Sequence, residues 1–183
     1  MTREFFPKTY ADSVARLRVP SGFLLVAAFA WFAHPSIHAL AYGVPVSFAG
    51  LALRAWAAGH LAKNQRLTTG GPYAYVRNPL YLGTMLVALG LAMAARSIGW
   101  ALLFAAVFLL IYLPVITLEE QHLAKLFAGY ATYAAGVPSL IPYRKPQPAE
   151  GRFRWQFYRK NREYQALLGF AAGLIYLIWK AVG

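Results

Sequence analysis

The sequence contains no cysteine and only 6 acidic residues among its 183. The absence of cysteine excludes disulfide bonds, thiolate metal sites and cysteine nucleophiles. Against the 6 acids stand 18 lysines and arginines, so the formal net charge is +12. Charged residues make up only 13% of the chain and hydrophobic residues 59%, whereas ordinary soluble domains have about 25% and 45–50%. This balance excludes a disordered chain and argues against a soluble nucleic-acid-binding protein, so we expect no nucleic-acid partner.

Segments without a single Asp, Glu, Lys or Arg are long and span residues 19–53, 78–95, 97–118 and 164–179. A helix needs about 20 mostly apolar residues to cross a bilayer. Residues 34–35 and 42–45 contain the proline and glycine that mark breaks, and they divide the longest segment. We therefore predict one all-α integral membrane domain over residues 1–183. It is a bundle of about five transmembrane helices near residues 19–41, 44–62, 80–95, 98–118 and 164–180.

The basic residues are distributed unevenly between the two ends of this predicted bundle. With the N-terminus in the cytosol, 15 of the 18 lysines and arginines are cytosolic, while Arg96 and Lys180 lie near the far side and Arg54 lies within a span. The positive-inside rule favours this orientation, and the charge then holds the cytosolic face against membrane lipids. The basic and aromatic residues 152–162 predict an interfacial helix before the last span.

The polar loop before the third span is the first candidate for a functional site. It contains Gly71, Pro72 and Arg77 and ends in Asn78-Pro79, a pair typical of a helix start with Asn as N-cap and Pro at the first position. The free N–H groups of such a helix start, together with the guanidinium of Arg77, suit a carboxylate or phosphate. The alternative is an ordinary turn between two spans.

Two of the six acids, Glu119 and Glu120, are adjacent where an apolar span meets the cytosol. Such carboxylates can accept hydrogen bonds from an amine or from sugar hydroxyls, although a solvated helix end is the alternative. Arg54, inside a span, is expected to face the bundle interior. There it would either pair with Glu119 or Glu120 or attract an anionic headgroup or carboxylate of a ligand, with His60 as a further candidate for binding that ligand. We expect no metal site.

An ordered set of motifs carries a resemblance. Residues 70–83 (GGPYAYVRNPLYLG), an apolar hairpin, Glu119-Glu120 and residues 127–142 (FAGYATYAAGVPSLIP) resemble the isoprenylcysteine carboxyl methyltransferase family. That family reads G-P-Y-x-x-V-R-H-P-x-Y-x-G, then E-E, then F-G-x-x-Y-x-x-Y-x-x-x-V-P-x-x-I-P, and phospholipid methyltransferases of the same superfamily share the double Glu. The resemblance covers about residues 54–142. Asn78 departs from it by replacing His, and Ala128-Gly129 lengthens one spacing by a residue.

The resemblance implies S-adenosylmethionine as cofactor, S-adenosylhomocysteine as product, and a cytosolic cofactor pocket built by about residues 54–142. Arg77 would bind the cofactor's carboxylate, Glu119 or Glu120 its amine or ribose, and tyrosines its adenine and sulfonium. Arg77, Glu119 and Glu120 are the candidate catalytic residues. The candidate cofactor-binding residues are Gly71, Tyr73, Val76, Arg77, Asn78, Tyr81, Glu119, Glu120, Tyr130 and Tyr133, and the candidate acceptor-binding residues are Arg54 and His60.

The expected function is methyl transfer from S-adenosylmethionine to a lipophilic, membrane-embedded acceptor. An isoprenylcysteine-like carboxylate needs no general base, whereas the amine of a phospholipid must lose a proton, for which Glu119 or Glu120 is available. One rival is an NADPH-dependent enzyme of the sterol-reductase type, with the basic residues 144–162 binding the 2′-phosphate. Another is a non-catalytic scaffold or transporter, which predicts ionisable residues along a lumen rather than at one membrane face. The acceptor and the oligomeric state stay open.

Overall fold

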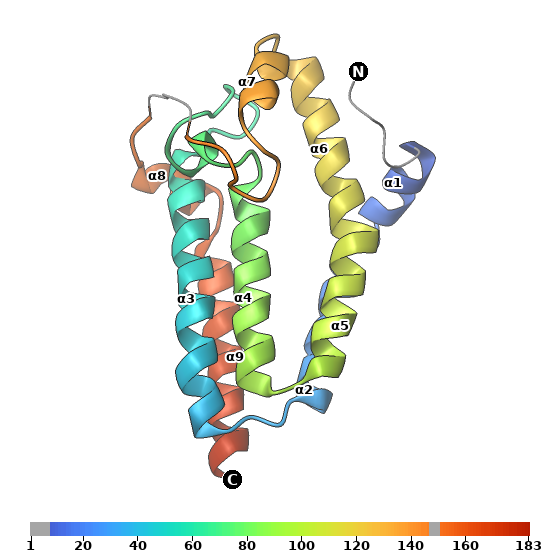
Figure 1. Cartoon of the computed structure of the whole chain (residues 1–183), viewed down its shortest axis with the longest axis vertical. Coiled ribbons are helices and arrows are strands. Elements are labelled where there is room, and N and C mark those ends of the chain that lie inside the picture. The colour runs from blue at the N-terminus through green and yellow to red at the C-terminus, as the bar shows by residue number, and fades with distance from the viewer. Residues whose placement is uncertain (1–7, 147–150) are drawn as a thin grey trace.

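The structure is a computed structural model that describes residues 8–146 and 151–183. Within those ranges it is all-helical, as predicted. The expected cytosolic N-terminus concerns residues 1–7, which lie outside the described ranges. Long helices form an elongated bundle, and short helices and loops gather at one end, opposite the C-terminus (Figure 1). The long helices are α2 Arg18–Phe32, α3 Ile37–His60, α4 Pro79–Ala95, α5 Ile98–Val107 continuing into α6 Leu113–Leu126, and α9 Tyr164–Val182; the short ones are α1 Lys8–Ala15, η1 Gly71–Ala74, α7 Tyr130–Gly136 and α8 Trp155–Lys160.

Three helices in the described part of the chain are long and apolar enough to cross a membrane: Ile37–His60, Ile98–Leu126 and Tyr164–Val182. Two further apolar helices, Pro20–Phe32 and Pro79–Ala95, are shorter. They would need a locally thinned bilayer or snorkelling side chains to cross it. A bundle of about five crossings therefore stays a prediction.

One of the two predicted breaks in the first apolar segment is wrong. The break at residues 34–35 is present, because α2 ends at Phe32 and α3 begins at Ile37, where Ser36 Oγ accepts from the N–H of Ala39 at 3.3 Å. At residues 42–45, however, α3 continues without interruption through Gly43 and Pro45. Apolar bundles tolerate a proline in a helix because neighbouring helices support the freed backbone groups. Here α4 packs closely against this part of α3.

The helices α5 and α6 also form one longer element than predicted. They are continuous from Ile98 to Leu126 through a π-helical turn, η2 Phe108–Tyr112, so the predicted span 98–118 and the helical stretch after it are one helix. Pro114 has no N–H for the carbonyl of Leu110, and the hydroxyl of Tyr10 on α1 donates to that carbonyl at 2.9 Å. The helix α6 ends at Leu126, and Gly129 is the N-cap of α7.

Small residues let α3 and α4 pack backbone to backbone. A Cβ added to Gly50 would lie 2.6 Å from the carbonyl oxygen of Gly83, and one added to Gly43 would collide with the carbonyl oxygen of Gly90. Ser47 Oγ, between these contacts, donates to the carbonyl of Val87 at 3.0 Å. Close packing of small residues and a hydrogen bond across the helices are the usual sources of helix association in membranes.

The apolar core lies toward the end of the bundle that is remote from the short helices. There the indole Nε1 of Trp100 donates to the carbonyl of Leu25 at 2.9 Å, and the ring of Phe29 meets the indole edge to face. The buried members of this cluster are Phe29, Ala33, Leu40, Ala88, Ala94, Ala95, Trp100 and Leu177. The polar end of the bundle lies outside this apolar cluster.

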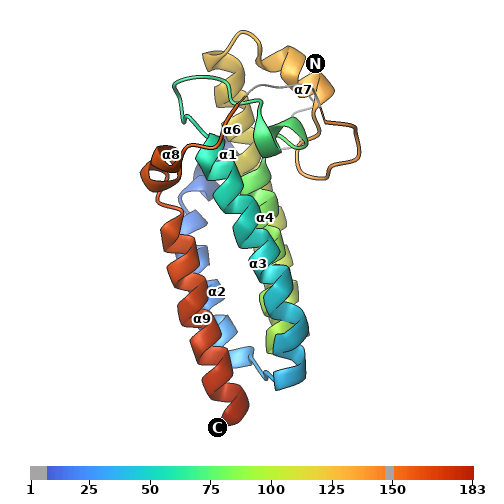
Figure 2. The same ribbon diagram turned by 90° about the vertical axis from the view of Figure 1, so that its left-hand side faces the viewer.

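The segment before α9 folds back over the end of α3 (Figure 2). Asn161 Nδ2 donates to the carbonyls of Ala58 and Leu61, both at 3.0 Å, and the N–H of Arg154 donates to the carbonyl of Gly59 at 2.8 Å. These bonds satisfy carbonyls that the end of a helix leaves without an intrahelical partner. The predicted interfacial helix is present as the short α8. Because the chain runs back over α3 between α8 and α9, Glu163 at the start of α9 lies beside α3.

Candidate functional site

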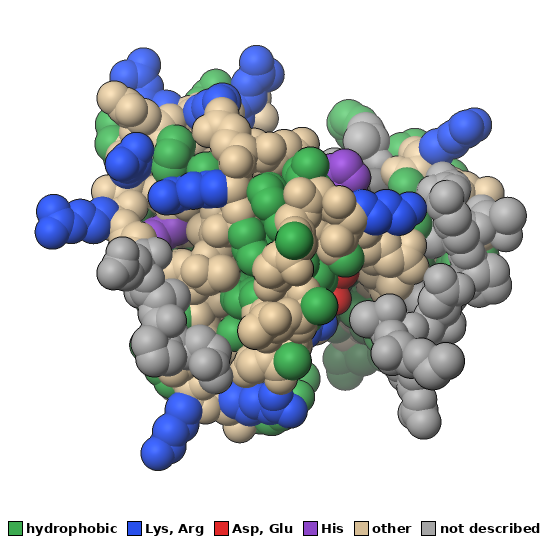
Figure 3. Space-filling view, turned by 90° about the horizontal axis from the view of Figure 1, so that it is seen from above, with side chains coloured by type: hydrophobic (Ala, Val, Ile, Leu, Met, Phe, Trp, Pro, Cys, Tyr) green, Lys and Arg blue, Asp and Glu red, His purple; other side chains and the backbone are tan. Residues whose placement is uncertain are grey.

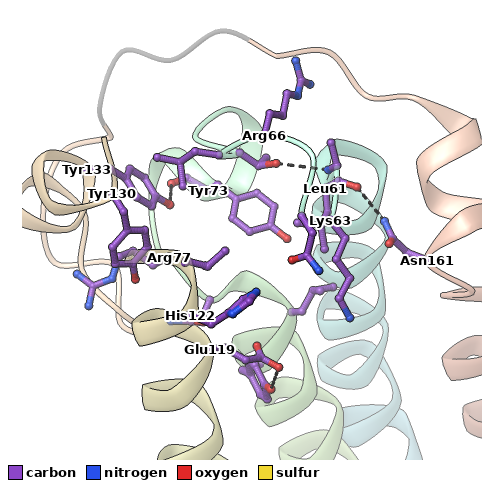
Figure 4. A pocket seen from close by; sticks show the side chains of 18 of the residues that line it. Leu61, Lys63, Arg66, Tyr73, Arg77, Glu119, His122, Tyr130, Tyr133 and Asn161 are labelled. Carbon is purple, nitrogen blue, oxygen red and sulfur yellow. Dashed lines mark hydrogen bonds between the residues drawn. The ribbon is translucent and has the colours of Figure 1, made fainter. Parts of the chain in front are cut away.

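A cavity of about 780 Å³ opens at the polar end of the bundle. Its walls come from the ends of α3 and α4, the loop between them, α6, α7 and the segment before α9. Figure 4 shows Tyr73, Tyr130 and Tyr133 near one another, Glu119 and His122 projecting from α6, and Lys63 near Asn161. From outside this end, basic side chains surround the rim and acidic side chains lie in a central recess (Figure 3). The volume is in the range of small-molecule sites.

Arg77 and Glu120 form a bidentate ion pair. Arg77 Nη2 donates to Glu120 Oε2 at 2.8 Å and Nε donates to Oε1 at 3.1 Å, while Nη1 donates to the carbonyls of Ala134 and Val137, both at 2.8 Å. The two side chains are only 16% and 20% exposed. Burial opposes the charge of Arg77, but hydrogen bonding to Glu120 and the attraction between their charges outweigh this and raise its pKa. The pair thereby joins the loop, α6 and the end of α7.

Asn78 occupies the predicted N-cap position of α4, but its side chain does not cap that helix. Nδ2 instead donates to Glu120 Oε1 at 2.6 Å, and Ser139 Oγ donates to the same oxygen at 2.8 Å. The predicted free N–H groups are not all free either, because those of Tyr81 and Leu82 donate to the carbonyl of Asn78 at 3.1 Å. The start of α4 therefore belongs to the hydrogen-bond network around Glu120. The sequence did not predict this network, because Ser139 belongs to no chemical motif.

Glu119 behaves differently from its neighbour. Its carboxylate lines the cavity, and the hydroxyl of Tyr81 donates to Oε1 at 3.0 Å. Tyr112 packs edge to face against Tyr81, with ring centroids 6.2 Å apart. Successive helical residues point in different directions, so α6 directs Glu119 to the cavity and Glu120 to the loop and α7.

The buried Tyr73 and Tyr130 and the half-buried Tyr133 line the cavity opposite Glu119. Burial is the main cause that raises the pKa of Tyr73, Tyr130 and Tyr133 above the usual tyrosine value, so all three are neutral phenols at physiological pH. The hydroxyl of Tyr133 donates to the carbonyl of Tyr73 at 2.8 Å. The buried hydroxyl of Tyr130 makes no hydrogen bond of ordinary geometry within residues 8–146 and 151–183, although it lies beside Arg77 and Glu120. A buried polar atom left in this way is costly unless a ligand meets it.

Arg54 does not pair with Glu119 or Glu120, contrary to one of the two predictions for it. Its Nε and Nη2 donate to the two carboxylate oxygens of Glu163 at 3.0 and 2.9 Å. Nη1 donates to the carbonyl of Leu80 at 3.2 Å and to the hydroxyl of Thr84. The sequence offered one weak signal for Glu163, an acid directly before an apolar segment. The return of the chain over α3 brings it to Arg54.

Several predicted site residues lie outside the cavity wall. His60 is buried, with Nδ1 2.9 Å from the carbonyl oxygen of Trp56. Gly71 has a left-handed φ of +60°, and a Cβ there would lie 2.7 Å from the His60 ring. Val76 is buried. These residues shape the loop from behind, whereas Arg54, Tyr73, Arg77, Asn78, Tyr81, Glu119, Tyr130 and Tyr133 line the cavity.

The cavity also has walls that sequence reasoning did not assign. Lys63 and Arg66 line it from the loop after α3, His122 from α6 and Asn161 from the segment before α9. From the sequence, Lys63 and Arg66 could either line a pocket or only anchor the interface, and Asn161 carried no signal. Among the described residues, no three His, Asp or Glu side chains are grouped in a way that could hold a metal ion.

Known proteins are similar in sequence to the part of the chain that builds most of this cavity. The sequence profile of the phospholipid methyltransferase family matches residues 17–129. A protein-S-isoprenylcysteine O-methyltransferase from Schizosaccharomyces pombe is 32% identical over 141 residues, 74% of this chain and 59% of that protein. The cobalt-zinc-cadmium resistance protein CzcN of Cupriavidus metallidurans is 37% identical over 91 residues, 49% of this chain and 42% of that protein.

A nickel-cobalt-cadmium resistance protein, NccN of Alcaligenes xylosoxydans xylosoxydans, is 34% identical over 91 residues, 49% of this chain and 43% of that protein. The chain thus spans about half the length of these curated relatives. No solved structure matches it. The apolar helices and the family together indicate a membrane protein. Because the profile covers more than half of the sequence, the chain belongs to the phospholipid methyltransferase family, in the superfamily that its motifs resemble.

Proposed function

We propose that this protein is an integral membrane methyltransferase that uses S-adenosylmethionine to methylate an amphiphilic acceptor presented by the bilayer. The cavity at the polar end of the bundle carries this proposal, because it combines a carboxylate, neutral aromatic rings and a buried hydroxyl without a regular hydrogen bond to the described residues. The protein-S-isoprenylcysteine O-methyltransferase of Schizosaccharomyces pombe, to which the chain is similar, supports it. We further propose that this end and the N-terminus are cytosolic, in keeping with the positive-inside rule.

The cavity residues fit the chemistry of S-adenosylmethionine. Glu119 is suited to accept from the cofactor's amine or ribose hydroxyls. The hydroxyl of Tyr130 is available as a further hydrogen-bonding group. Neutral tyrosine rings can stack with adenine and attract a positive sulfonium through their faces. Arg77 and Glu120, which use their charges on each other, hold the loop and α7 in place rather than contacting the cofactor directly.

The cofactor supplies a methyl group that is already activated by its attachment to a positive sulfur. The protein therefore contributes positioning and exclusion of water. The buried tyrosines keep one wall dry, and Arg77 with Glu120 fixes that wall against α6. For an amine acceptor, Glu119 is the residue placed to accept the proton that the nucleophile loses. An isoprenylcysteine-like carboxylate acceptor needs no such step.

Binding and product analysis test this function. Calorimetry with S-adenosylhomocysteine and, separately, NADPH on the purified protein should give binding of the former alone. Incubation with radiolabelled S-adenosylmethionine and a membrane lipid extract should then label a lipophilic product. A product that releases its labelled methyl group as methanol in mild base is a methyl ester and indicates a carboxylate acceptor. A labelled methyl group that mild base does not release indicates a phospholipid amine. Binding of NADPH alone would support the reductase rival, and binding of neither nucleotide the scaffold or transporter.

A further inference from the structure

A second, smaller cavity of about 220 Å³ lies between α3, α8 and the start of α9. Its walls are almost entirely apolar, and its residues are Phe48, Leu51, Ala52, Ala55, Tyr158 and Leu167, together with Arg54 and Glu163. Phe48 and Leu167 are 50% and 45% exposed on the outer surface of the bundle. In a membrane, this apolar groove would therefore be open to hydrocarbon chains from the side.

Arg54 and Glu163 line both the apolar groove and the large polar cavity. Their ion pair, with Nη2 2.9 Å from the carboxylate, stands where the two spaces meet. The side chains are 22% and 10% exposed, so the pair is largely shielded from water. A molecule with a polar head in the cavity and an apolar chain in the groove must pass this pair.

We propose that the Arg54–Glu163 pair is the gate for the methyl acceptor, and that Arg54 then binds the acceptor's anionic group in place of Glu163. This inference rests on the proposed function. The occupant is an amphiphile with a carboxylate or phosphate near its head and one hydrocarbon chain in the apolar groove. The continuity of the groove with the polar cavity, through the same two residues, specifies an occupant of this kind.

Arg54 is better suited to this role than the other cations of the cavity. It keeps contacts with the carbonyl of Leu80 and the hydroxyl of Thr84 when Glu163 is replaced, so its guanidinium stays in position. Arg77 already has its carboxylate and two carbonyls at 2.8 Å. Exchanging one anion for another keeps the guanidinium of Arg54 paired, and an unpaired buried charge is the costly outcome when such a pair is broken. The displaced Glu163 also lines the polar cavity, where its carboxylate can turn toward water.

The first test measures binding of anionic and neutral amphiphiles to the purified full chain in a neutral detergent. The probes are a farnesylated N-acetylcysteine, its uncharged methyl ester, and a single-chain lysophosphatidic acid. At least one anionic probe should bind at least about tenfold more tightly than the ester, because a charge-assisted hydrogen bond contributes about 1.5–3 kcal/mol. The carboxylate and phosphate probes distinguish the two sources of the anion. Equal binding of all three would overturn the proposal.

Variants then assign this preference to the gate. Arg54→Gln should weaken the preferred anionic probe by roughly tenfold or more. Glu163→Gln should strengthen the same probe several-fold, because it removes the competing carboxylate. Arg159→Gln, on the exposed surface of α8, is the control with no effect. Weaker anion binding in Glu163→Gln, or unchanged binding in Arg54→Gln, would contradict the gate.

A matched pair on α9 tests the groove without touching the ion pair. Leu167 lines the apolar groove, whereas Leu168 is 63% exposed and lies outside it. Leu167→Trp should reduce affinity for the farnesylated probe several-fold, and Leu168→Trp should leave it unchanged. Equal affinities in these two variants would remove the groove from the proposal. If S-adenosylhomocysteine binds the wild type and these variants behave otherwise than expected, only the gate fails; if it does not bind at all, the proposed function fails.

Discussion

Glu119 and Glu120 are neighbours in the sequence, but the structure separates their surroundings. Glu120 receives donors from Arg77, Asn78 and Ser139, and its contacts are within the protein. Glu119 lines the cavity and receives the hydroxyl of Tyr81. Both carry the same charge, so only their surroundings distinguish a candidate ligand-binding carboxylate from one that supports the fold.

Substituting each carboxylate by its amide should separate these two roles. Glu119→Gln should weaken S-adenosylhomocysteine roughly tenfold or more, the loss expected for a charged hydrogen bond, with thermal unfolding unchanged. Glu120→Gln should lower the free energy of unfolding by about 3 kcal/mol, because it leaves the mostly buried Arg77 unpaired. Calorimetry and thermal unfolding in detergent measure the two effects. A Glu119→Gln protein that binds normally would remove Glu119 from the cofactor site.

Tyr130 and Tyr133 on α7 differ in their hydroxyl groups. The hydroxyl of Tyr133 donates a hydrogen bond to Tyr73, whereas that of Tyr130 makes no regular hydrogen bond to the described residues. Tyr130→Phe removes a buried hydroxyl that lacks such a bond in the described part of the chain, so unfolding free energy should stay equal or rise by about 1 kcal/mol, while cofactor affinity falls. Tyr133→Phe removes the bond to Tyr73 and should lower unfolding free energy by about 1 kcal/mol. Unchanged affinity in Tyr130→Phe would show that its hydroxyl does not meet the cofactor.

At the scale of the elements, packing between α3 and α4 overrides local sequence signals. Gly43 and Pro45 predict a break, yet α3 passes through both because α4 lies against its glycines. The break at residues 34–35 is confirmed, since α2 ends at Phe32, the N–H of His34 donates to the carbonyl of Ala95 at 2.8 Å, and Ser36 caps the new start. Turn residues therefore predicted helix ends correctly only where tertiary contacts did not oppose them.

A glycine-to-alanine comparison tests the α3–α4 contact. Gly50→Ala places a methyl group 2.6 Å from a backbone oxygen of α4, so the helices must separate, and we expect a loss of about 1–3 kcal/mol, as in overpacked cores. Gly22 in α2 has nothing within 4 Å of its added Cβ, and Gly22→Ala should stabilise by about 0.5–1 kcal/mol. The melting temperatures in detergent should move in opposite directions; a stable Gly50→Ala protein would contradict the close packing.

For the molecule as a whole, the two ends of the bundle differ in chemistry. The end with α7 and α8 has basic residues around its rim and the polar cavity in its recess (Figures 1 and 3). The opposite end has the apolar cluster around Trp100 and the C-terminus. This polarity supports the proposal that one membrane face holds a water-soluble cofactor while the groove between α3 and α9 admits a lipid.

The absence of cysteine makes the orientation directly measurable. Single cysteines replacing Arg159 on α8 and Gly183 at the C-terminus occupy exposed positions at opposite ends. A membrane-impermeant maleimide added to intact cells should label Gly183→Cys, whereas Arg159→Cys should be labelled only after permeabilisation. The cysteine-free parent is the background control. The reverse pattern would place the cavity outside the cytosol.

Composition and periodicity alone determined the helical class, the apolar segments, the uneven charge and the family motifs, because these depend on residue type and local spacing. Tertiary structure decided which charges meet. Arg77 pairs with Glu120, and Arg54 pairs with Glu163 rather than with either acid of the motif. Residues 109 positions apart come together because the chain after α7 returns over the end of α3. Such long-range contacts depend on the path of the backbone, which no local pattern records.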